Sequence, residues 1–319
     1  MTVVSISVQG VALIISAEGR VGFAEDLKGP PFIGGDVLDA AYLQISEILQ
    51  AQQGFSLAGY KARSIKRRIA ARIRAVGMTG TEPYIVLLAE SPDEQQKLLT
   101  ALSIHVSHFF RNPSTYRELK KKVLPVLLQR SRVNHSKLRI WSIGCAYGEE
   151  PYSLALLLQR FLLPSDQLAI IATDLSSAAL QRAKAGQYDP SRLTEVPERL
   201  LREYFQPQGK EYRLAEEIRK MVQFFRHDIL SEQPFYRADL ILCRNVLIYF
   251  SREQQRRILQ ILAAALPAGG FLVLGRAETL VTSCRELFRC INPAERIYQR
   301  LETDEQLLPM AYVQQLQDF

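Results

Sequence analysis

The sequence contains few of the residues that build disulfide frameworks or metal sites. Of its 319 residues, only four are cysteine and four are histidine. No cysteine stands in a C-x-x-C pair, and the histidines are too scattered to suggest a set of metal ligands. We therefore expect reduced thiols in a cytoplasmic protein, and no metal centre.

Long apolar runs are also missing. Hydrophobic residues make up 47% of the chain, but no run of about 18 apolar residues occurs, so we expect no membrane insertion. The apolar start, MTVVSISVQGVALIISAEGR, lacks the basic region and cleavage site of a signal peptide. We interpret residues 1–38 as an extension of unknown structure. The rest of the chain is long enough for one large and one smaller core, which predicts two domains.

Acidic residues are absent between Phe55 and Thr81, where basic residues gather. The seven bases are Lys61, Arg63, Lys66, Arg67, Arg68, Arg72 and Arg74. At helical spacing the apolar residues here form one stripe, and the bases occupy the remaining surface. The stripe consists of Ala62, Ile65, Ile69, Ile73 and Val76. Since compensating acids are absent from the segment, we expect a positive face, with an ordinary solvated surface as the alternative. No nucleic-acid recognition motif accompanies it, so we expect no nucleic acid partner.

The most informative stretch is WSIGCAYGEEPYS, residues 141–153. An apolar strand breaks at Gly144, passes Gly148, and enters a helix that Pro151 suits in its first turn and that continues to Leu163. Glycines at both positions would let the backbone accept positive φ and approach a ligand closely. A plain strand-to-helix turn is the alternative.

Further strands and helices alternate after this loop. Strands are expected at 167–174, ending in Asp174, at 220–228, ending in Asp228, at 238–250 and at 269–275. Ser251 and Gln254 form a helix-capping pattern between the last two. This alternation predicts an α/β fold with a parallel sheet covered on both faces and a ligand at the carboxyl ends of the strands.

The acids of the glycine loop indicate which ligand it binds. A dinucleotide site places phosphate at the helix N-terminus, where Glu149 and Glu150 would repel it. S-adenosylmethionine carries a sulfonium, an ammonium and a ribose, and it fits these acids and Asp174 better. Capping of the helix dipole is the alternative for the two glutamates.

Five separated motifs resemble the chemotaxis receptor methyltransferase family, CheR. They are SHFFRNP (107–113), WSIGCAYGEEPYS, ATDLS (172–176), CRNVLIYF (243–250) and LGRAETL (274–280). The resemblance covers about residues 39 to 300. It implies a helical N-terminal domain at 39–115 and a class I, Rossmann-like methyltransferase domain at 116–301. It also implies a small β-subdomain inserted at 190–220, which leaves 302–319 as a tail.

The resemblance also assigns residues to the cofactor and to the reaction. With Gly144 of the loop, the implied cofactor contacts are His105, Ser107, Arg111, Glu150, Asp174, Asp228, Ile229, Cys243 and Arg244. Arg111 and Tyr249 match the positions nearest the transferred methyl group. The family often has Asn and Thr where this chain has His105 and Ser107, and Asn where it has Asp228. Ser107 keeps the hydroxyl and Asp228 can still accept a hydrogen bond, whereas His105 departs from the pattern. A surface arginine and a core aromatic in a strand are the alternatives for Arg111 and Tyr249.

The implied reaction is methylation of receptor glutamates to methyl esters, with S-adenosylhomocysteine as product. A glutamate is already ionised near neutral pH, because its unperturbed pKa is about 4.3, so no general base is needed. The implied partner is the acidic methylation region of chemoreceptor cytoplasmic helices, and we expect a monomer that binds it through the basic segment. We assign this contact to Lys61, Arg63, Lys66, Arg67 and Arg74. Two alternatives remain: a methyltransferase of the same fold acting on another signalling protein, and a non-catalytic module that senses S-adenosylmethionine.

Overall fold

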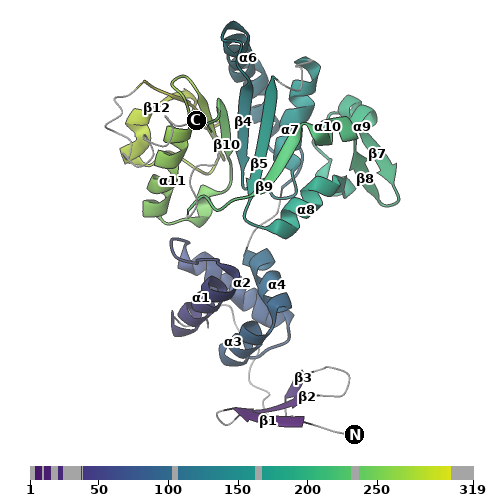
Figure 1. Cartoon of the computed structure of the whole chain (residues 1–319), viewed down its shortest axis with the longest axis vertical. Helices are drawn as coiled ribbons and strands as arrows, with labels where there is room; N and C mark the ends of the chain where they lie inside the picture. The colour runs from purple at the N-terminus through teal and green to yellow at the C-terminus, as the bar shows by residue number, and fades with distance from the viewer. Residues whose placement is uncertain are drawn as a thin grey trace. The chain divides into compact units, whose positions relative to one another are not determined.

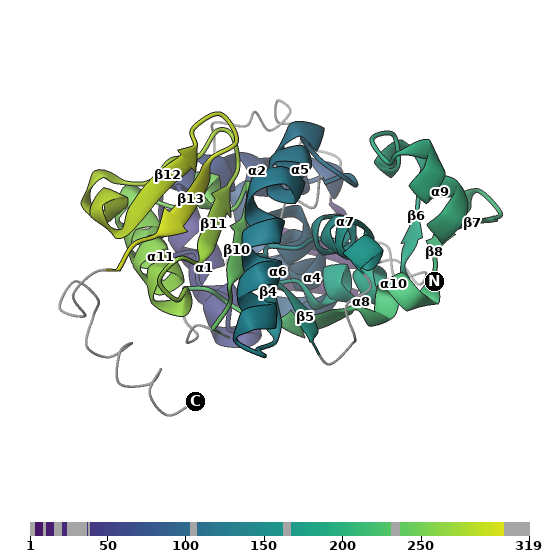
Figure 2. The same ribbon diagram turned by 90° about the horizontal axis from the view of Figure 1, so that it is seen from above.

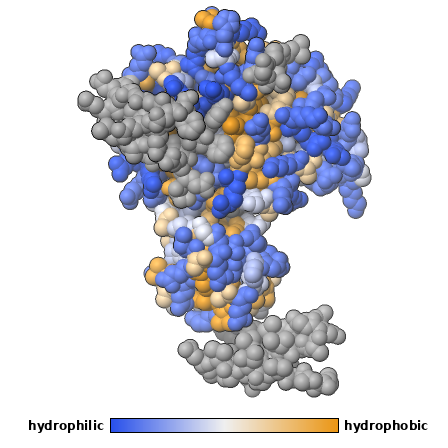
Figure 3. Space-filling model, viewed as in Figure 1, coloured by the Kyte–Doolittle hydropathy of each residue, from blue (hydrophilic) through white to orange (hydrophobic). Residues whose placement is uncertain are grey.

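The computed structural model describes residues 4–8, 11–15, 21–23, 37, 39–102, 107–161, 167–230 and 237–302 (Figure 1). The chain divides into two compact units, Met1–Leu57 with Ala62–Leu102, and Ala58–Lys61 with Ser103–Phe319. Within the extension, β1 (Val4–Val8), β2 (Val11–Ile15) and β3 (Val21–Phe23) pair antiparallel in that order. On the face drawn in Figure 3, hydrophilic residues cover most of both units. Among the helices in the described ranges, none is long and apolar enough to cross a membrane.

The first unit contains the predicted helices. They are α1 (Asp39–Gln53), α2 (Ala62–Ala75), α3 (Thr81–Glu90) and α4 (Pro92–Leu102). Ile65, Ile69 and Ile73 are buried along α2, which confirms the centre of the apolar stripe, whereas Ala62 at the helix start is exposed. At the start of α4 the Ser91 hydroxyl accepts a hydrogen bond from the Glu94 amide at 3.1 Å, and this cap separates α4 from α3.

The basic helix α2 is partly neutralised by acids of neighbouring helices, although its own segment contains none. Arg72 forms a bidentate pair with Glu94 of α4, with Nε–Oε1 and Nη2–Oε2 distances of 2.7 and 2.6 Å. Lys66 pairs with Asp39 of α1 at 2.6 Å. These acids are distant in sequence but adjacent in the folded helical unit. The bases exposed on α2 are Arg63, Arg67 and Arg74.

The second unit is built on a seven-stranded sheet in the order β12-β13-β11-β10-β4-β5-β9 (Figures 1 and 2). The parallel strands are β4 (Leu138–Ile143), β5 (Leu168–Asp174), β9 (Val222–Arg226), β10 (Leu240–Cys243) and β11 (Phe271–Leu274). All five lie where strands were predicted. The sequence did not predict β12 (Phe288–Asn292) and β13 (Ile297–Arg300), which pair antiparallel at one edge.

Helices cover both faces of this sheet. Alternate strand residues point to opposite faces and pack with these helices in two separate cores. One core contains Ile140 and Val273 and is covered by α6 (Leu124–Val133), α7 (Glu149–Leu158) and α8 (Ser177–Ala185). The other contains Trp141 and Leu272 and is covered by α11 (Arg252–Ala265). The predicted α/β fold, with a largely parallel sheet covered on both faces, is therefore confirmed. Helix α6 continues from α5 (Pro113–Glu118) through the π-helical turn η1 (Leu119–Val123).

A small β-subdomain is inserted between α8 and β9, as expected. Its antiparallel sheet has the order β6-β8-β7, from β6 (Gln187–Tyr188), β7 (Phe205–Gln208) and β8 (Glu211–Leu214). The turn between β7 and β8 contains Gly209 at φ 63°. The 3-10 turn η3 (Pro190–Arg192) and helices α9 (Glu198–Tyr204) and α10 (Glu216–Lys220) complete it.

Two element boundaries differ from the prediction by more than two residues, while β9, expected to end in Asp228, ends two residues earlier at Arg226. The strand expected at 238–250 ends at Cys243, because Asn245 adopts φ 60° and the chain then forms the 3-10 turn η4 (Leu247–Tyr249). Tyr249 is therefore not a strand residue. Helix α7 ends at Leu158 and continues only as the 3-10 turn η2 (Gln159–Phe161). Ser251 does cap α11, since its hydroxyl accepts from the Gln254 amide at 3.4 Å.

Candidate functional site

The glycine loop after β4 has the left-handed backbone that its sequence predicted. Gly144 and Gly148 have φ of 66° and 89°. A Cβ at Gly144 would lie 2.6 Å from Cγ2 of Val246, in the loop after β10. Glycine is thus required here by close packing of two loops at the carboxyl end of the sheet, a reason that the sequence did not reveal.

Asp174 holds this loop from the end of β5. Its carboxylate accepts hydrogen bonds from the amides of Ala146 and Ser176, both at 2.9 Å. Only 9% of the residue is exposed. Each carboxylate oxygen has more than one lone pair, so Asp174 could also accept a hydrogen bond from a ligand hydroxyl.

The two glutamates that open α7 have different partners. Glu149 is fully buried and pairs with Arg192 of η3, which ties the helix to the β-subdomain. Glu150 accepts from the Ser142 hydroxyl at 2.8 Å and pairs with Arg244 at 3.2 Å. Burial raises the pKa of both carboxyls, while their arginine partners act to lower it. Capping of the helix dipole is therefore not the only role of either acid.

Arg244 joins the end of β10 to the SHFFRNP segment. Its side chain is 2% exposed. Its Nη2 donates to the Arg111 carbonyl at 2.8 Å and to Oδ1 of Asn112 at 3.0 Å. The amide of Phe110 donates to the Ser153 hydroxyl at 2.8 Å. These contacts fix the backbone that carries Arg111 against α7 and β10.

The segment before Arg111 contains two other predicted residues. Ser107 is half-buried, and its carbonyl accepts from Arg192 at 3.2 Å. His105 lies outside the described residues. The pKa of His108 is lowered mainly by partial burial and then by the positive charge of Arg111.

Tyr249 lies on a turn that a buried acid holds in shape. The Glu278 carboxylate accepts hydrogen bonds from the amides of Gly275, Asn245 and Ile248, at 2.6, 2.9 and 3.2 Å. Glu278 is 4% exposed and received no role from the sequence. Its place in the LGRAETL motif, directly after a buried strand, was the available signal.

The remaining predicted cofactor residues lie at the ends of β9 and β10. Asp228 accepts a hydrogen bond from the Leu230 amide at 2.9 Å, and Ile229 is buried beside it. Cys243 ends β10 with a fully buried side chain in the core, and burial raises the pKa of its thiol. The parallel sheet thus brings Gly144, Asp174, Asp228 and Arg244 to the carboxyl ends of its strands. No group of three or more His, Cys, Asp or Glu within the described ranges could hold a metal ion.

Of the predicted substrate residues, Lys61 directly precedes α2, which begins at Ala62, but it belongs to the second unit. Its amide donates to the Tyr249 carbonyl at 2.8 Å, and its Nζ donates to the Ile248 carbonyl at 2.7 Å. Lys61 therefore contacts the turn that carries Tyr249. Lys66 is occupied by Asp39, as described above.

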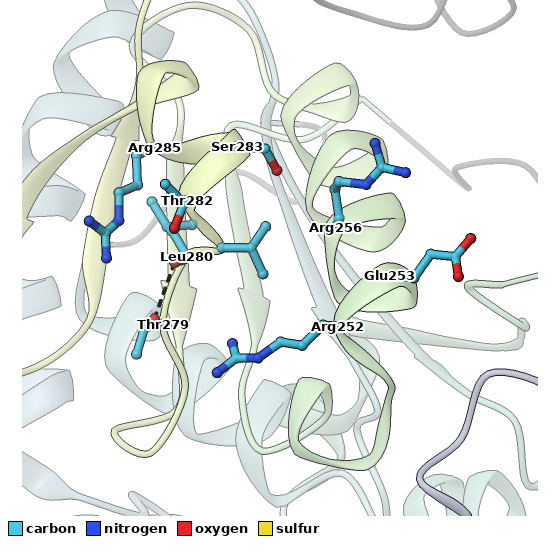
Figure 4. A pocket seen from close by; sticks show the side chains of 9 residues that line it. Arg252, Glu253, Arg256, Thr279, Leu280, Thr282, Ser283 and Arg285 are labelled. Carbon is cyan, nitrogen blue, oxygen red and sulfur yellow. Dashed lines mark hydrogen bonds between the residues drawn. The ribbon is translucent and has the colours of Figure 1, made fainter.

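A separate surface pocket of about 610 Å³ lies between α11 and the 3-10 turn η5 (Thr282–Leu287). Its lining residues are Arg252, Glu253, Arg256, Thr279, Leu280, Val281, Thr282, Ser283 and Arg285. None of them was a predicted site residue. Figure 4 shows Arg252 extending from α11 toward Thr279, whereas Glu253 and Arg256 point away from it. The pocket is basic, with three arginines and one acid.

A helical unit followed by an α/β unit with acids at the carboxyl ends of its strands is the arrangement expected of an S-adenosylmethionine-dependent methyltransferase with an N-terminal helical domain, and the comparisons with known proteins assign the chain to that class. Residues 40–103 match the family model "CheR methyltransferase, all-alpha domain", and residues 105–297 match "CheR methyltransferase, SAM binding domain". The chain belongs to the CheR methyltransferase family, and its cofactor is S-adenosylmethionine.

Curated relatives agree with this membership. The chain is 36% identical to the chemotaxis protein methyltransferase of Listeria monocytogenes over 76% of its own length and 92% of the relative's. It is 32% identical to chemotaxis protein methyltransferase 2 of Pseudomonas aeruginosa, over 75% and 86% of the two chains. It is also 35% identical to an uncharacterized 104.1 kDa protein of Rhodobacter capsulatus, over 81% of this chain but only 27% of that protein.

The residues present fit this cofactor. Asp174 offers carboxylate lone pairs at the end of β5, where a doubly wound fold binds ribose hydroxyls. Gly144, at φ 66°, lets the loop after β4 turn toward Asp174, whose carboxylate binds the Ala146 amide of that loop. The acidic first turn of α7 disfavours a phosphate there, and S-adenosylmethionine has none.

Proposed function

We propose that this protein methylates glutamate side-chain carboxylates of chemoreceptor proteins, giving glutamate methyl esters and S-adenosylhomocysteine. The proposal rests on a network at the carboxyl end of the sheet, in which Arg244 donates to the backbone carbonyl of Arg111 and to the carboxylate of Glu150. This network holds the SHFFRNP segment of a CheR-family chain at the edge where Asp174 lies. A cationic side chain delivered there suits an anionic acceptor.

The site's own acids favour an acceptor that needs no general base. Glu149 pairs with Arg192, Glu150 pairs with Arg244, and Glu278 binds three backbone amides. Each carboxylate therefore has a structural role. A substrate glutamate arrives already ionised, because its unperturbed pKa is about 4.3. The bound cofactor supplies an electrophilic methyl group on its sulfonium.

The chain's residues would then act by positioning and by excluding water. In this proposal Asp174 accepts hydrogen bonds from the ribose, and Asp228 and Ile229 lie at the adenine end. Arg111 holds the incoming carboxylate, and Tyr249 offers a hydroxyl beside it. In a well-oriented reaction, alignment and exclusion of water can lower the activation barrier by roughly 7 to 11 kcal/mol, so these residues can catalyse the transfer without a general base.

Two basic surfaces could attract an acidic receptor helix. One is the α2 set, the exposed Arg63, Arg67 and Arg74 of the helical unit. The other is the α11 pocket described above, with Arg252, Arg256 and Arg285. Long-range attraction of this kind acts mainly on the association rate and weakens as salt rises. Substituting the two sets separately would show which of them selects the partner.

The test is transfer of a tritiated methyl group to receptor-enriched membranes, followed by alkaline release of volatile methanol. Only carboxyl methyl esters release methanol, so label that stays on the protein would contradict the proposal, as would the absence of transfer. Arg111→Ala should lower transfer by at least tenfold without a matching loss of thermal stability. Arg117→Ala, an exposed arginine on α5, is the matched control and should be unchanged. Near-normal transfer by Arg111→Ala would remove Arg111 from the reaction.

A further inference from the structure

A short segment between α1 and α2 belongs structurally to the methyltransferase unit. Residues Ala58–Lys61 group with the second unit, although α1 and α2 on either side of them belong to the first. The Ser251 amide donates to the Gly59 carbonyl at 2.8 Å, and the Lys61 amide donates to the Tyr249 carbonyl at 2.8 Å. Tyr60 and Phe250 form an antiparallel β-bridge between these two bonds. An isolated antiparallel bridge thus joins the segment to the last residue of η4 and to the two residues that follow it.

Side-chain contacts fix the segment further. The rings of Tyr60 and Phe250 pack with centroids 4.7 Å apart. Tyr60 also packs against the sheet core that contains Ile229. Gly59 has φ 89°, and a Cβ there would lie 2.6 Å from Cγ of Gln254, so close approach to α11 requires glycine. The position of Tyr60 in this unit is therefore built by backbone and side-chain contacts together.

The surroundings of the Tyr60 hydroxyl indicate what it faces. Burial raises the pKa of Tyr60, and the negative charges of Asp228 and Asp174 raise it further. The phenol is therefore neutral at physiological pH and remains a hydrogen-bond donor. Its ring also packs against the core that contains Ile229, the residue after Asp228, beside the proposed nucleoside site.

We propose that Tyr60 belongs to the S-adenosylmethionine site and contacts the nucleoside part of the bound cofactor. This inference rests on the proposed roles of Asp174 and Asp228. A tyrosine offers a flat ring for an adenine and a hydroxyl for a ribose or for the acids that bind it. The segment that carries Tyr60 also contacts the Tyr249 turn through Lys61, so the same segment would join the cofactor contact to that turn.

The experiment compares three variants by calorimetric titration with S-adenosylhomocysteine and with 5′-methylthioadenosine, which contains the nucleoside without the amino acid. Tyr60→Ala should weaken binding of both ligands by about tenfold to a hundredfold. Tyr60→Phe keeps the ring and should lose less than Tyr60→Ala. Tyr212→Ala, a half-buried tyrosine on β8, is the control and should bind both ligands normally.

The outcomes separate this inference from the proposed site. If a folded Tyr60→Ala variant binds both ligands as wild type while Asp174→Asn does not, Tyr60 is outside the site and the inference is overturned. If neither variant changes affinity, the proposed cofactor site itself is wrong. Loss for S-adenosylhomocysteine alone would overturn the nucleoside contact. Should Tyr60→Ala fail to fold, Tyr60→Leu replaces it, and the same comparison decides.

Discussion

The role of Asp174 can be tested by replacing it with asparagine, because its carboxylate has two separate functions. In the structure it accepts hydrogen bonds from the Ala146 and Ser176 amides. In the proposed site it also accepts from the cofactor ribose. An asparagine has one acceptor oxygen, so it can satisfy one amide while its NH2 group faces the other. Asp174→Asn should therefore reduce both stability and affinity.

The expected magnitudes follow from these contacts. Losing one hydrogen bond to a charged, buried acceptor reduces the free energy of unfolding by about 1.5 to 3 kcal/mol. A similar loss toward the ribose weakens S-adenosylhomocysteine binding by roughly tenfold to 150-fold. At a ligand concentration 100 times the wild-type Kd, wild type gains about 2.7 kcal/mol of stability. A variant with tenfold weaker binding gains about 1.4 kcal/mol, and one with hundredfold weaker binding gains about 0.4 kcal/mol.

The assay is urea unfolding with and without S-adenosylhomocysteine, which measures both effects in one experiment. Asp189→Asn is the matched control, because the exposed Asp189 carboxylate also accepts from the amide two residues later, at 2.8 Å from Ser191. That variant should keep the full ligand-induced gain. If Asp174→Asn gains as much stability from the ligand as wild type, Asp174 does not bind the cofactor and the assignment is refuted.

Three further outcomes are expected. Gly144→Ala should lose about 2 to 4 kcal/mol of stability, because the new Cβ would occupy left-handed backbone and clash with Val246. Gly209→Ala has a similar φ but open space around it, so it should lose only the backbone part. Equal losses of the two variants in urea unfolding would contradict this. The methyl-transfer rate at saturating substrates should be flat between about pH 6 and 8, because a carboxylate with an unperturbed pKa near 4.3 is ionised throughout. A rate that rises with pH would instead favour a hydroxyl or amine acceptor. Replacing Arg67 and Arg74 by Gln should slow the initial rate of receptor methylation at low salt and make that rate less dependent on salt. Cofactor affinity should stay unchanged. If wild type and variant have identical rates at every ionic strength, α2 is only a solvated surface.

The fold was largely predictable because its main elements have local signals. The five parallel strands are short apolar runs that end in glycine, acid or arginine, and the alternation with helices admits few architectures. The two missed strands, β12 and β13, carry exposed or half-buried polar residues such as Arg289 and Gln299. β12 is the edge strand and is partly solvated, whereas β13 is mostly buried but mixes Gln299 and Arg300 with its apolar residues, so neither strand has a clear apolar period.

The candidate site was only partly predictable, for a different reason. Residues at strand ends, such as Asp174 and Arg244, follow from topology, because parallel strands bring their carboxyl ends together. Partners that are distant in sequence have no local signal. Glu94 neutralises Arg72, and Tyr60 reaches the methyltransferase unit from between two helices of the other unit. Only the folded chain reveals these contacts.

Two buried acids at the site, Glu278 and Glu150, have raised pKa values, which affects the stability of the fold. Burial raises the pKa of Glu278 and Glu150 above the usual value, even though backbone amides bind the first and Arg244 binds the second. A carboxyl whose pKa is higher in the folded state binds more protons there than in the unfolded chain. Its contribution to stability therefore decreases as the pH rises from the unfolded pKa, about 4.3, through the folded one. At neutral pH both charges lower the stability of the fold, while they hold the Tyr249 turn and the Arg111 segment in place. Acids retained at such a cost are better explained by the geometry of a reaction site than by folding.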